Sequence, residues 1–307
     1  MKKLVTYLQS TNRSSIALAI LRIFICLHLL KKIILEWRNM ELIYGPTSII
    51  SHLPMRFGQY VLDSTVFREH FHLLLTCYIL VILLFFFGIG KNITNVILMA
   101  FLILFQRLDW LILNGGDNLL FFLVLYLTFA NSFDHFAISK PSLKRESTRR
   151  LVNLLSNLAA YSIMFQFCLI YIVSAMHKLH ADVWFNGIAV YYTFMLDRFR
   201  GTPLNNALAR NEFFVTFSTY FTVFFEMYFP VLVFVKKLKP YLVMMGLALH
   251  MGIYVFMMIY DFQFVFIFSY IIFFSDEELL SYKQRFIDPI SEKFRSKKEP
   301  SGQVLPN

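Results

Sequence analysis

The sequence predicts an all-α fold, a polytopic integral membrane bundle of about eight transmembrane helices. Of its 307 residues, 58% are hydrophobic and 18% are aromatic, whereas an ordinary soluble domain is about 45–50% apolar. The charged residues, 16% of the chain, lie almost entirely between long apolar runs, as expected where lipid penalises an unpaired charge. Residues 1–282 are therefore expected to form one transmembrane domain, and residues 283–307 a basic, disordered cytoplasmic tail.

Eight apolar segments meet the length requirement for a span, which is about 20 residues and fewer where neighbouring helices bury the ends. Only Tyr260 and Asp261 separate the last two segments, so 240–275 is either two spans in a tight hairpin or a re-entrant segment. The first segment is expected to be an uncleaved signal anchor. The eight segments are 15–35, 70–88, 92–108, 117–135, 151–177, 212–235, 240–260 and 262–275.

The basic residues predict the orientation in the cell membrane. With the N-terminus inside, the inner segments hold 18 of the 29 Lys and Arg residues, the outer ones hold eight, and three lie in the first span. Both termini are therefore expected in the cytoplasm, and 36–69, 106–118 and 178–211 face outward. The formal charge of +10 fits anionic membrane lipid better than nucleic acid, because the basic residues flank the apolar runs.

Three ionisable residues, Arg22, Glu226 and His250, lie within apolar runs, where such groups are normally paired or functional. At about 1.5 Å of rise per residue, Arg22 and Glu226 both lie about 10–14 Å from the inner face. This predicts an Arg22–Glu226 ion pair, either a structural staple or a functional pair. His250, near mid-membrane, is either a hydrogen-bonded interhelical contact or a ligand-binding group. Neither the histidines nor the three cysteines have metal-ligand spacing, so we expect no metal site.

The turn at 106–118 is a second polar cluster. Its Gly115-Gly116 pair allows unusual backbone angles, and Asp117 or Asn118 can cap the helix that follows. The turn is either only a capped connection between helices or part of an outward-facing pocket. In the second case the lining, substrate-binding residues are Arg107, Asp109, Asn114 and Asp117.

The longest apolar run ends at His177-Lys178, on the predicted outer face. A lysine beside low-dielectric surroundings is disfavoured as an ammonium and can act as a base. The alternative is a lysine that reaches into the headgroups and anchors the helix. In the first reading Lys178 is catalytic, with His177, Asp117 and Asp182 as polar neighbours, and Trp184 and the aromatic segment 182–200 shield an outward-opening cavity.

Three stretches resemble the horizontally transferred transmembrane (HTTM) domain family. They are Asn114-Gly115-Gly116-Asp117-Asn118, the Lys178-Leu179, Ala181-Asp182 and Trp184 positions, and Leu249-His250-Met251-Gly252 with Asp261-Phe262. In the best-known family member, the vitamin K-dependent gamma-glutamyl carboxylase, the lysine matching Lys178 deprotonates vitamin K hydroquinone. The resemblance thus implies a quinone as candidate cofactor. Gly116 stands where the carboxylase has a functional histidine, and the large lumenal region is absent, so full glutamate carboxylation is not expected.

The leading prediction is a membrane protein that modifies or processes a secreted peptide or a lipid-phase substrate at the extracytoplasmic face, with Lys178 as base. The alternative is a non-catalytic membrane partner in maturation or export of a secreted peptide toxin. It follows from resemblance to the sporulation-delaying toxin B type, which works with a small partner protein. A transporter is disfavoured because the sequence shows no inverted repeat.

Overall fold

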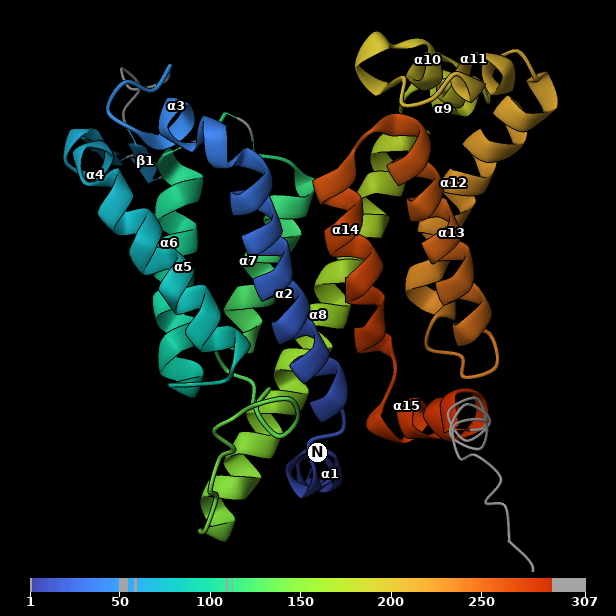
Figure 1. Ribbon diagram of the computed structural model, residues 1–307. Coiled ribbons are helices and arrows are strands. Elements are labelled where there is room, and N and C mark those ends of the chain that lie inside the picture. Colours follow the sequence, from blue (N-terminus) through green and yellow to red (C-terminus); the bar gives the residue numbers. More distant parts are fainter. Residues whose placement is uncertain (1, 50–54, 58–59, 109, 112, 289–307) are drawn as a thin grey trace, which may run out of the picture.

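The computed structural model describes residues 2–49, 55–57, 60–108, 110–111 and 113–288, which form a bundle of helices and one short antiparallel hairpin (Figure 1). The hairpin pairs β1 (Met55–Phe57) with β2 (Tyr60–Leu62). Each predicted apolar segment overlaps mainly with one helix of the bundle. These helices are α2 (Ser15–Glu36), α5 (Phe71–Phe86), α6 (Lys91–Leu108), α7 (Gly115–Leu127), α8 (Glu146–Leu179), α12 (Glu212–Leu232), α13 (Lys239–Met257) and α14 (Tyr260–Ser269).

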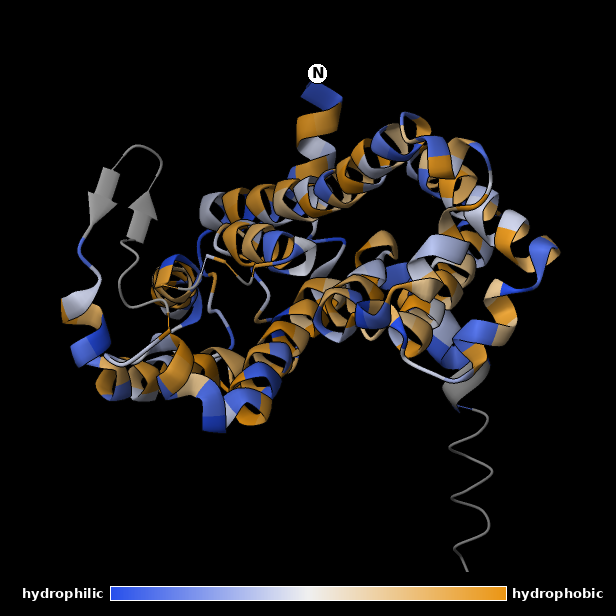
Figure 2. Cartoon of the chain, turned by 90° about the horizontal axis from the view of Figure 1, so that it is seen from above, coloured by the Kyte–Doolittle hydropathy of each residue, from blue (hydrophilic) through white to orange (hydrophobic). Residues whose placement is uncertain are grey.

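Four of the helices in the described chain, α6, α8, α12 and α13, are long and apolar enough to cross a membrane. The helices α5, α7 and α14 are apolar but shorter, and α2 carries Arg22, Lys31 and Lys32 in its 22 residues. Apolar residues cover most of the helices (Figure 2). These features indicate a membrane protein.

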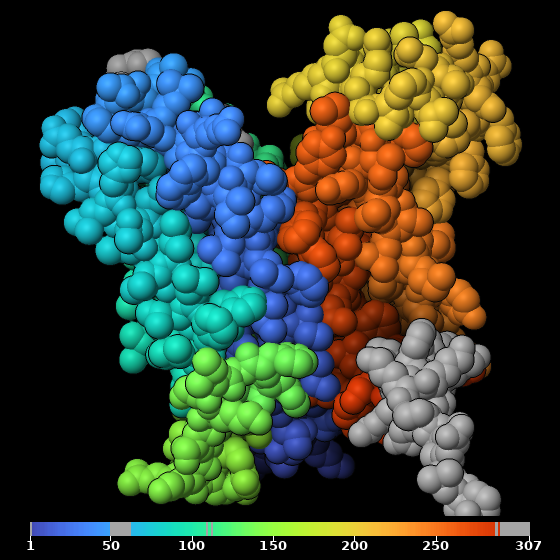
Figure 3. Space-filling model, viewed as in Figure 1, coloured from blue at the N-terminus to red at the C-terminus, as the bar shows by residue number. Residues whose placement is uncertain are grey.

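The short helices gather at the two ends of the bundle (Figure 1). One end carries α3 (Met40–Tyr44), α4 (Thr65–Glu69), α9 (Asp182–Phe185), α10 (Ala189–Met195) and α11 (Leu204–Ala209). The other carries α1 (Lys2–Ser10) and α15 (Asp276–Tyr282). The segments predicted to face outward thus share one end, which we call the outer end. A notch separates the α2–α3 region from the α9–α11 region there (Figure 3).

The last two helices form a hairpin rather than one continuous helix. Met258 adopts a left-handed conformation, with φ of 55°, and ends α13, and α14 begins two residues later and packs against it. Only Val243, Gly246 and His250 of α13 are buried. A Cβ at Gly246 would lie 2.1 Å from Tyr270 Oη, so glycine is needed where α13 approaches that residue. The predicted C-terminal tail begins with one π-helical turn, Lys283–Ile287, and its residues 289–307 lie outside the described chain.

Two buried arginines hold the connections at opposite ends. Arg22 is fully buried and donates to the carbonyl oxygens of Ser132, His135 and Phe136, beyond the end of α7. Arg68, 2% exposed, donates to the carbonyls of Ile43 and Leu108. The guanidinium suits this role because its donors are fixed in a planar fork.

The predicted Arg22–Glu226 ion pair is wrong. The Arg22 donors go to backbone carbonyls, and Glu226 pairs with Lys178. The prediction measures the depth of Glu226 along a span that starts at the membrane face. In the structure, the first turns of α12 lie beside α10 and α11 at the outer end. For example, the Val190 amide donates to Thr219 Oγ1 at 3.2 Å. Glu226, two turns further along, therefore reaches the end of α8 rather than the level of Arg22.

Helix α15 contacts the first turn of α2, far from it in the sequence. The carboxylate of Asp276 accepts from the amides of Ser15 and Ile16 at 3.0 and 2.9 Å and from Ser15 Oγ at 2.6 Å. It thereby caps the first turn of α2, where Ser14 makes no side-chain cap. Nearby, Lys239 Nζ contacts both carboxylate oxygens of Glu278 at 2.8 Å. Burial alone would raise the pKa of Glu278, but hydrogen bonds from Lys239 and Ser275 hold it below its usual value.

Replacing Asp276 by alanine is expected to lower the free energy of unfolding by about 1–2 kcal/mol, the usual cost of a lost N-cap. Thermal unfolding of the detergent-purified protein measures the change. The matched control is Glu277→Ala, since Glu277 is exposed in the same first turn of α15. Equal melting temperatures for the two variants would show that the cap contributes nothing.

Candidate functional site

A cavity of about 600 Å³ lies between α8, α12, α13 and α14, with α9 and α10 contributing to its wall. We call it the α8–α14 cavity. Its volume falls in the range of roughly 300–1,000 Å³ typical of small-molecule sites. Aromatic and aliphatic side chains make up most of its wall, which includes Ile170, Phe194, Phe214, Phe221, Met245, Leu249, Ile253, Phe256, Met257, Phe262 and Phe266.

The charged feature of this wall is an ion pair between Lys178 and Glu226. Lys178 Nζ lies 2.8 and 2.6 Å from the two Glu226 carboxylate oxygens and 2.6 Å from Ser174 Oγ. The two side chains are only 17% and 10% exposed. Three acceptors thus satisfy the three donors of the ammonium, and the pair brings no net charge into apolar surroundings.

The sequence of α8 places these groups on one face. Tyr171, Ser174 and Lys178 follow the three- and four-residue spacing of a helix face and all line the cavity. Trp184 of α9 covers the pair, with Lys178 Nζ 5.1 Å from its ring centroid, a cation–π distance. Gly187 has a φ of 72°, and a Cβ there would lie 3.0 Å from the Tyr220 ring. Glycine therefore lets the chain turn back against α12 directly after Trp184.

A neutral polar network lies deeper in the same cavity. His250, 3% exposed, contacts Tyr171 Oη through Nε2 at 2.6 Å and the Gln263 side-chain oxygen through Nδ1. Tyr171 Oη also contacts Tyr270 Oη. Tyr171, His250 and Gln263 line the cavity. Of the two readings of His250, the interhelical contact is present, and His250 also lies in the cavity wall.

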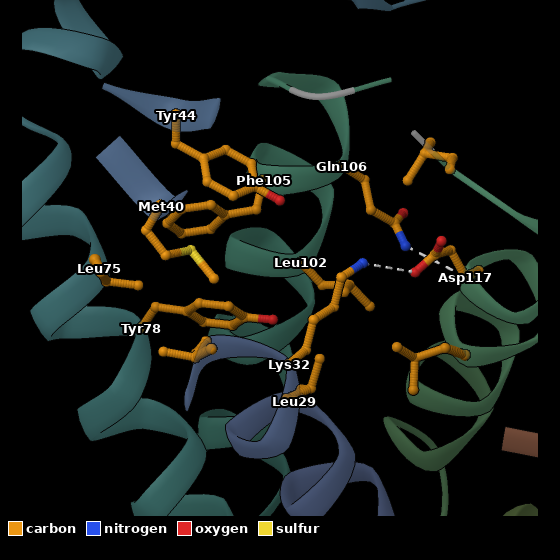
Figure 4. Close-up of a pocket in the computed structure, with 13 residues that line it drawn as sticks. Leu29, Lys32, Met40, Tyr44, Leu75, Tyr78, Leu102, Phe105, Gln106 and Asp117 are labelled. Atoms are coloured by element: carbon orange, nitrogen blue, oxygen red, sulfur yellow. Dashed lines mark hydrogen bonds and ion pairs between the residues drawn. The ribbon is translucent and has the colours of Figure 1, made fainter. Parts of the chain in front are cut away.

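A second polar cluster lies between α2, α7 and α14. Lys32 Nζ is 3.3 Å from Asp117, which is 5% exposed, and Lys31 Nζ is 2.5 Å from Asp261. Lys32, Gln106 and Asp117 line a separate cavity of about 50 Å³, whose other walls include Tyr44, Tyr78 and Phe105 (Figure 4). This volume has room for a few water molecules at most, so the cluster is best explained as a buried electrostatic connection between helices.

The structure separates residues that the sequence grouped together. Lys178, Trp184 and His250 line the α8–α14 cavity, whereas Asp117 lies in the second cluster. His177 and Asp182 are exposed and are not among the cavity-lining residues. The predicted neighbours of Lys178 are therefore corrected to Glu226 and Ser174.

The 106–118 turn is capped, and of the residues predicted to line a pocket there, Asp117 lines the cavity of about 50 Å³. Asn114 Oδ1 accepts from the amides of Gly116 and Asp117, and the Asp117 carboxylate accepts from the Asn114 amide at 2.9 Å. The N-cap residue is thus Asn114, and Asp117 completes a capping box with it. Arg107 is exposed, and Asp109 lies outside the described residues. None of the described residues of this turn lines the α8–α14 cavity.

Close packing explains why position 116 is a glycine. A Cβ at this position would lie 2.7 Å from Phe262 Cα in α14. A histidine cannot occupy the position without moving α14.

The chain was compared with protein families, curated proteins and solved structures. No family model, no curated protein and no solved structure matches the chain.

Proposed function

We propose that the protein is a multi-pass membrane protein of the HTTM type, with eight spans and both termini in the cytoplasm, that modifies a lipid-phase substrate or a secreted peptide at the extracytoplasmic face. One observation carries the proposal: a largely apolar cavity of about 600 Å³ has the Lys178–Glu226 pair in its wall. Such a cavity suits a molecule that partitions into lipid and has one polar reactive group. A quinone of the kind that the resemblance implies has these properties.

The ion pair supplies a route to a base. Proton transfer from Lys178 Nζ to a Glu226 oxygen 2.6 Å away leaves a neutral amine and a neutral carboxylic acid. Low-dielectric surroundings reduce the cost of that transfer because they penalise separate charges. The amine lone pair can then take a proton from an acidic O–H of the ligand, and the resulting ammonium stabilises the ligand oxyanion. Lys178 is the catalytic residue in this scheme, and Glu226 holds the proton that Lys178 gave up.

A specific observation favours the alternative as well. All three donors of the Lys178 ammonium have acceptors inside the protein, as in a purely structural connection between α8 and α12. In that case the protein is a non-catalytic partner in peptide toxin maturation or export, bound to a secreted peptide and a small partner protein. The paired substitutions that open the Discussion separate the two functions.

Filling the cavity tests the proposal most directly. Gly252 lines the cavity, and a Cβ there would meet no atom within 4 Å. Gly252→Leu is therefore expected to occupy the cavity without a backbone clash. Because glycine disfavours a helix interior by about 1 kcal/mol, the variant should be at least as stable as the parent.

Binding is measured with a prenylated naphthoquinone, which quenches tryptophan fluorescence, in the Trp37→Phe/Trp110→Phe background that leaves Trp184 as the single tryptophan. We expect saturable quenching in the parent and at least a tenfold weaker apparent affinity in Gly252→Leu. The control Met244→Leu changes an exposed residue of α13 outside the cavity lining and should bind as the parent does. Equal quenching in the parent and in Gly252→Leu would refute ligand binding in this cavity.

A further inference from the structure

The hydrogen-bonded chain Tyr270–Tyr171–His250–Gln263 connects α8, α13 and α14 with the segment after α14, and Gln263 ends it at the cavity wall. The four residues are between 1% and 3% exposed. Four polar side chains in apolar surroundings are costly unless their donors and acceptors are matched. Within this network, the donor and the acceptor of each hydrogen bond follow from those of its neighbour.

The donors and acceptors are assigned starting from Gln263, whose side-chain oxygen faces His250. An amide oxygen only accepts, so His250 Nδ1 is the donor. In a neutral imidazole the other nitrogen then accepts, and Tyr171 Oη–H donates to His250 Nε2 across 2.6 Å. Tyr171 Oη in turn accepts from Tyr270. Every member of the network is satisfied, except for the Gln263 amide nitrogen.

The two N–H groups of Gln263 Nε2 have no acceptor among the described residues. Gln263 is 1% exposed and lines the α8–α14 cavity, next to Phe262 and Phe266. A donor left unmatched in such surroundings costs about 1–3 kcal/mol. With the amide oxygen toward His250, neither N–H group of the Gln263 amide has an acceptor within the network.

We propose that the Gln263 amide nitrogen recognises a hydrogen-bond acceptor oxygen, such as a carbonyl or an ester oxygen, on a lipid-phase ligand. Gln263 is a specificity-determining residue, and His250, Tyr171 and Tyr270 are positioning residues that hold its amide in place. Tyr171 lies seven residues before Lys178 on the same helix face, about 10 Å along the axis. The ligand therefore meets a hydrogen-bond donor at a different level from the ion pair.

This inference rests on the proposed function, because it requires a ligand in the α8–α14 cavity. Its test uses two brominated probes of equal chain length, a fatty acid methyl ester and an alkane, whose bromine atoms quench Trp184. The protein is the full chain in lipid nanodiscs with Trp184 as its single tryptophan. The ester carries the acceptor oxygen and the alkane does not, so their affinity ratio reports on recognition of that oxygen.

We expect the parent to bind the ester about tenfold more tightly than the alkane, as one well-made hydrogen bond in an apolar site allows. Gln263→Met, similar in shape and without donors, should remove this preference while alkane binding stays within about twofold. The control Thr193→Val removes another polar group from the wall, whose Oγ1 already donates to the Ala189 carbonyl at 2.9 Å. This control should keep the preference.

The outcomes are separable. If Gln263→Met keeps the full ester preference, or if the parent has none, the Gln263 assignment is overturned while cavity binding stands. If neither probe quenches Trp184 in the parent, the proposed function fails together with the assignment. Unchanged alkane binding by Gln263→Met shows that the variant is folded, so a lost preference supports the assignment.

Discussion

Replacing both members of the ion pair, as Lys178→Met/Glu226→Leu, is expected to abolish the biological output of the protein while its stability stays within about 1 kcal/mol of the parent. Two apolar side chains of similar volume avoid the cost of burying charges, and substitutions of this kind are often neutral or stabilising. The same double variant has neither the base nor its proton acceptor. It therefore tests chemistry without the confounding loss of fold.

The single variants should behave differently. Lys178→Met leaves Glu226 as an unpaired carboxylate with a side chain only 10% exposed, which is expected to cost about 3–5 kcal/mol. Glu226→Leu leaves the ammonium in the same position. Melting temperatures of the three variants in detergent give the stability side of the comparison. Both single variants should melt well below the double variant.

Output is measured by comparing, by mass spectrometry, the lipids and secreted peptides of cells that express the parent, the double variant or no protein. We expect the double variant to match the cells without the protein. A stable, membrane-inserted double variant whose lipid and peptide profile equals that of the parent would exclude Lys178 from catalysis. That result would leave the non-catalytic partner as the better explanation.

The sequence predicts the helices well because apolar runs and polar interruptions are the features that a bilayer imposes. Helices occupy all eight predicted segments, and the turn before α7 is capped as one of its two readings expects. The short helices α1 and α15 were missed because their apolar residues are too few to register as spans. The hairpin of β1 and β2 was missed because each strand is only three residues long.

The site is harder to predict because it depends on how far each helix extends beyond its neighbour. Lys178 could be selected from its position at the end of an apolar run. Glu226 was recognised as a buried acid but assigned the wrong partner, since α12 starts at the outer end beside α10 and α11. Gln263 was missed because a neutral amide among Phe262, Phe264 and Phe266 carries no charge signal. The available indication was its polarity within an otherwise aromatic run of α14.

Arg22 is the residue whose loss should destabilise the protein most. It is 0% exposed, and its guanidinium donates to three backbone carbonyls in the connection that leaves α7. Arg22→Met removes all three hydrogen bonds and leaves the buried Ser132 carbonyl and the part-buried His135 and Phe136 carbonyls without this donor. Since an unmatched buried polar group costs about 1–3 kcal/mol, we expect a total loss of roughly 3–6 kcal/mol. Thermal unfolding in detergent measures this loss of stability, and protease cleavage within 128–145 reports on the connection itself.

Arg22→Lys discriminates between the two things that Arg22 supplies, positive charge and fixed donor geometry. A lysine keeps the charge, but its compact ammonium cannot span carbonyls that a planar fork reaches together, so Arg22→Lys should be nearly as unstable as Arg22→Met. The matched control is Arg150→Met, because the Arg150 side chain is 61% exposed and pairs with Glu146 on the surface of α8. Surface pairs of this kind contribute at most about 1 kcal/mol. If Arg22→Lys melted like the parent, positive charge alone would explain how Arg22 holds the connection, and guanidinium geometry would not be needed.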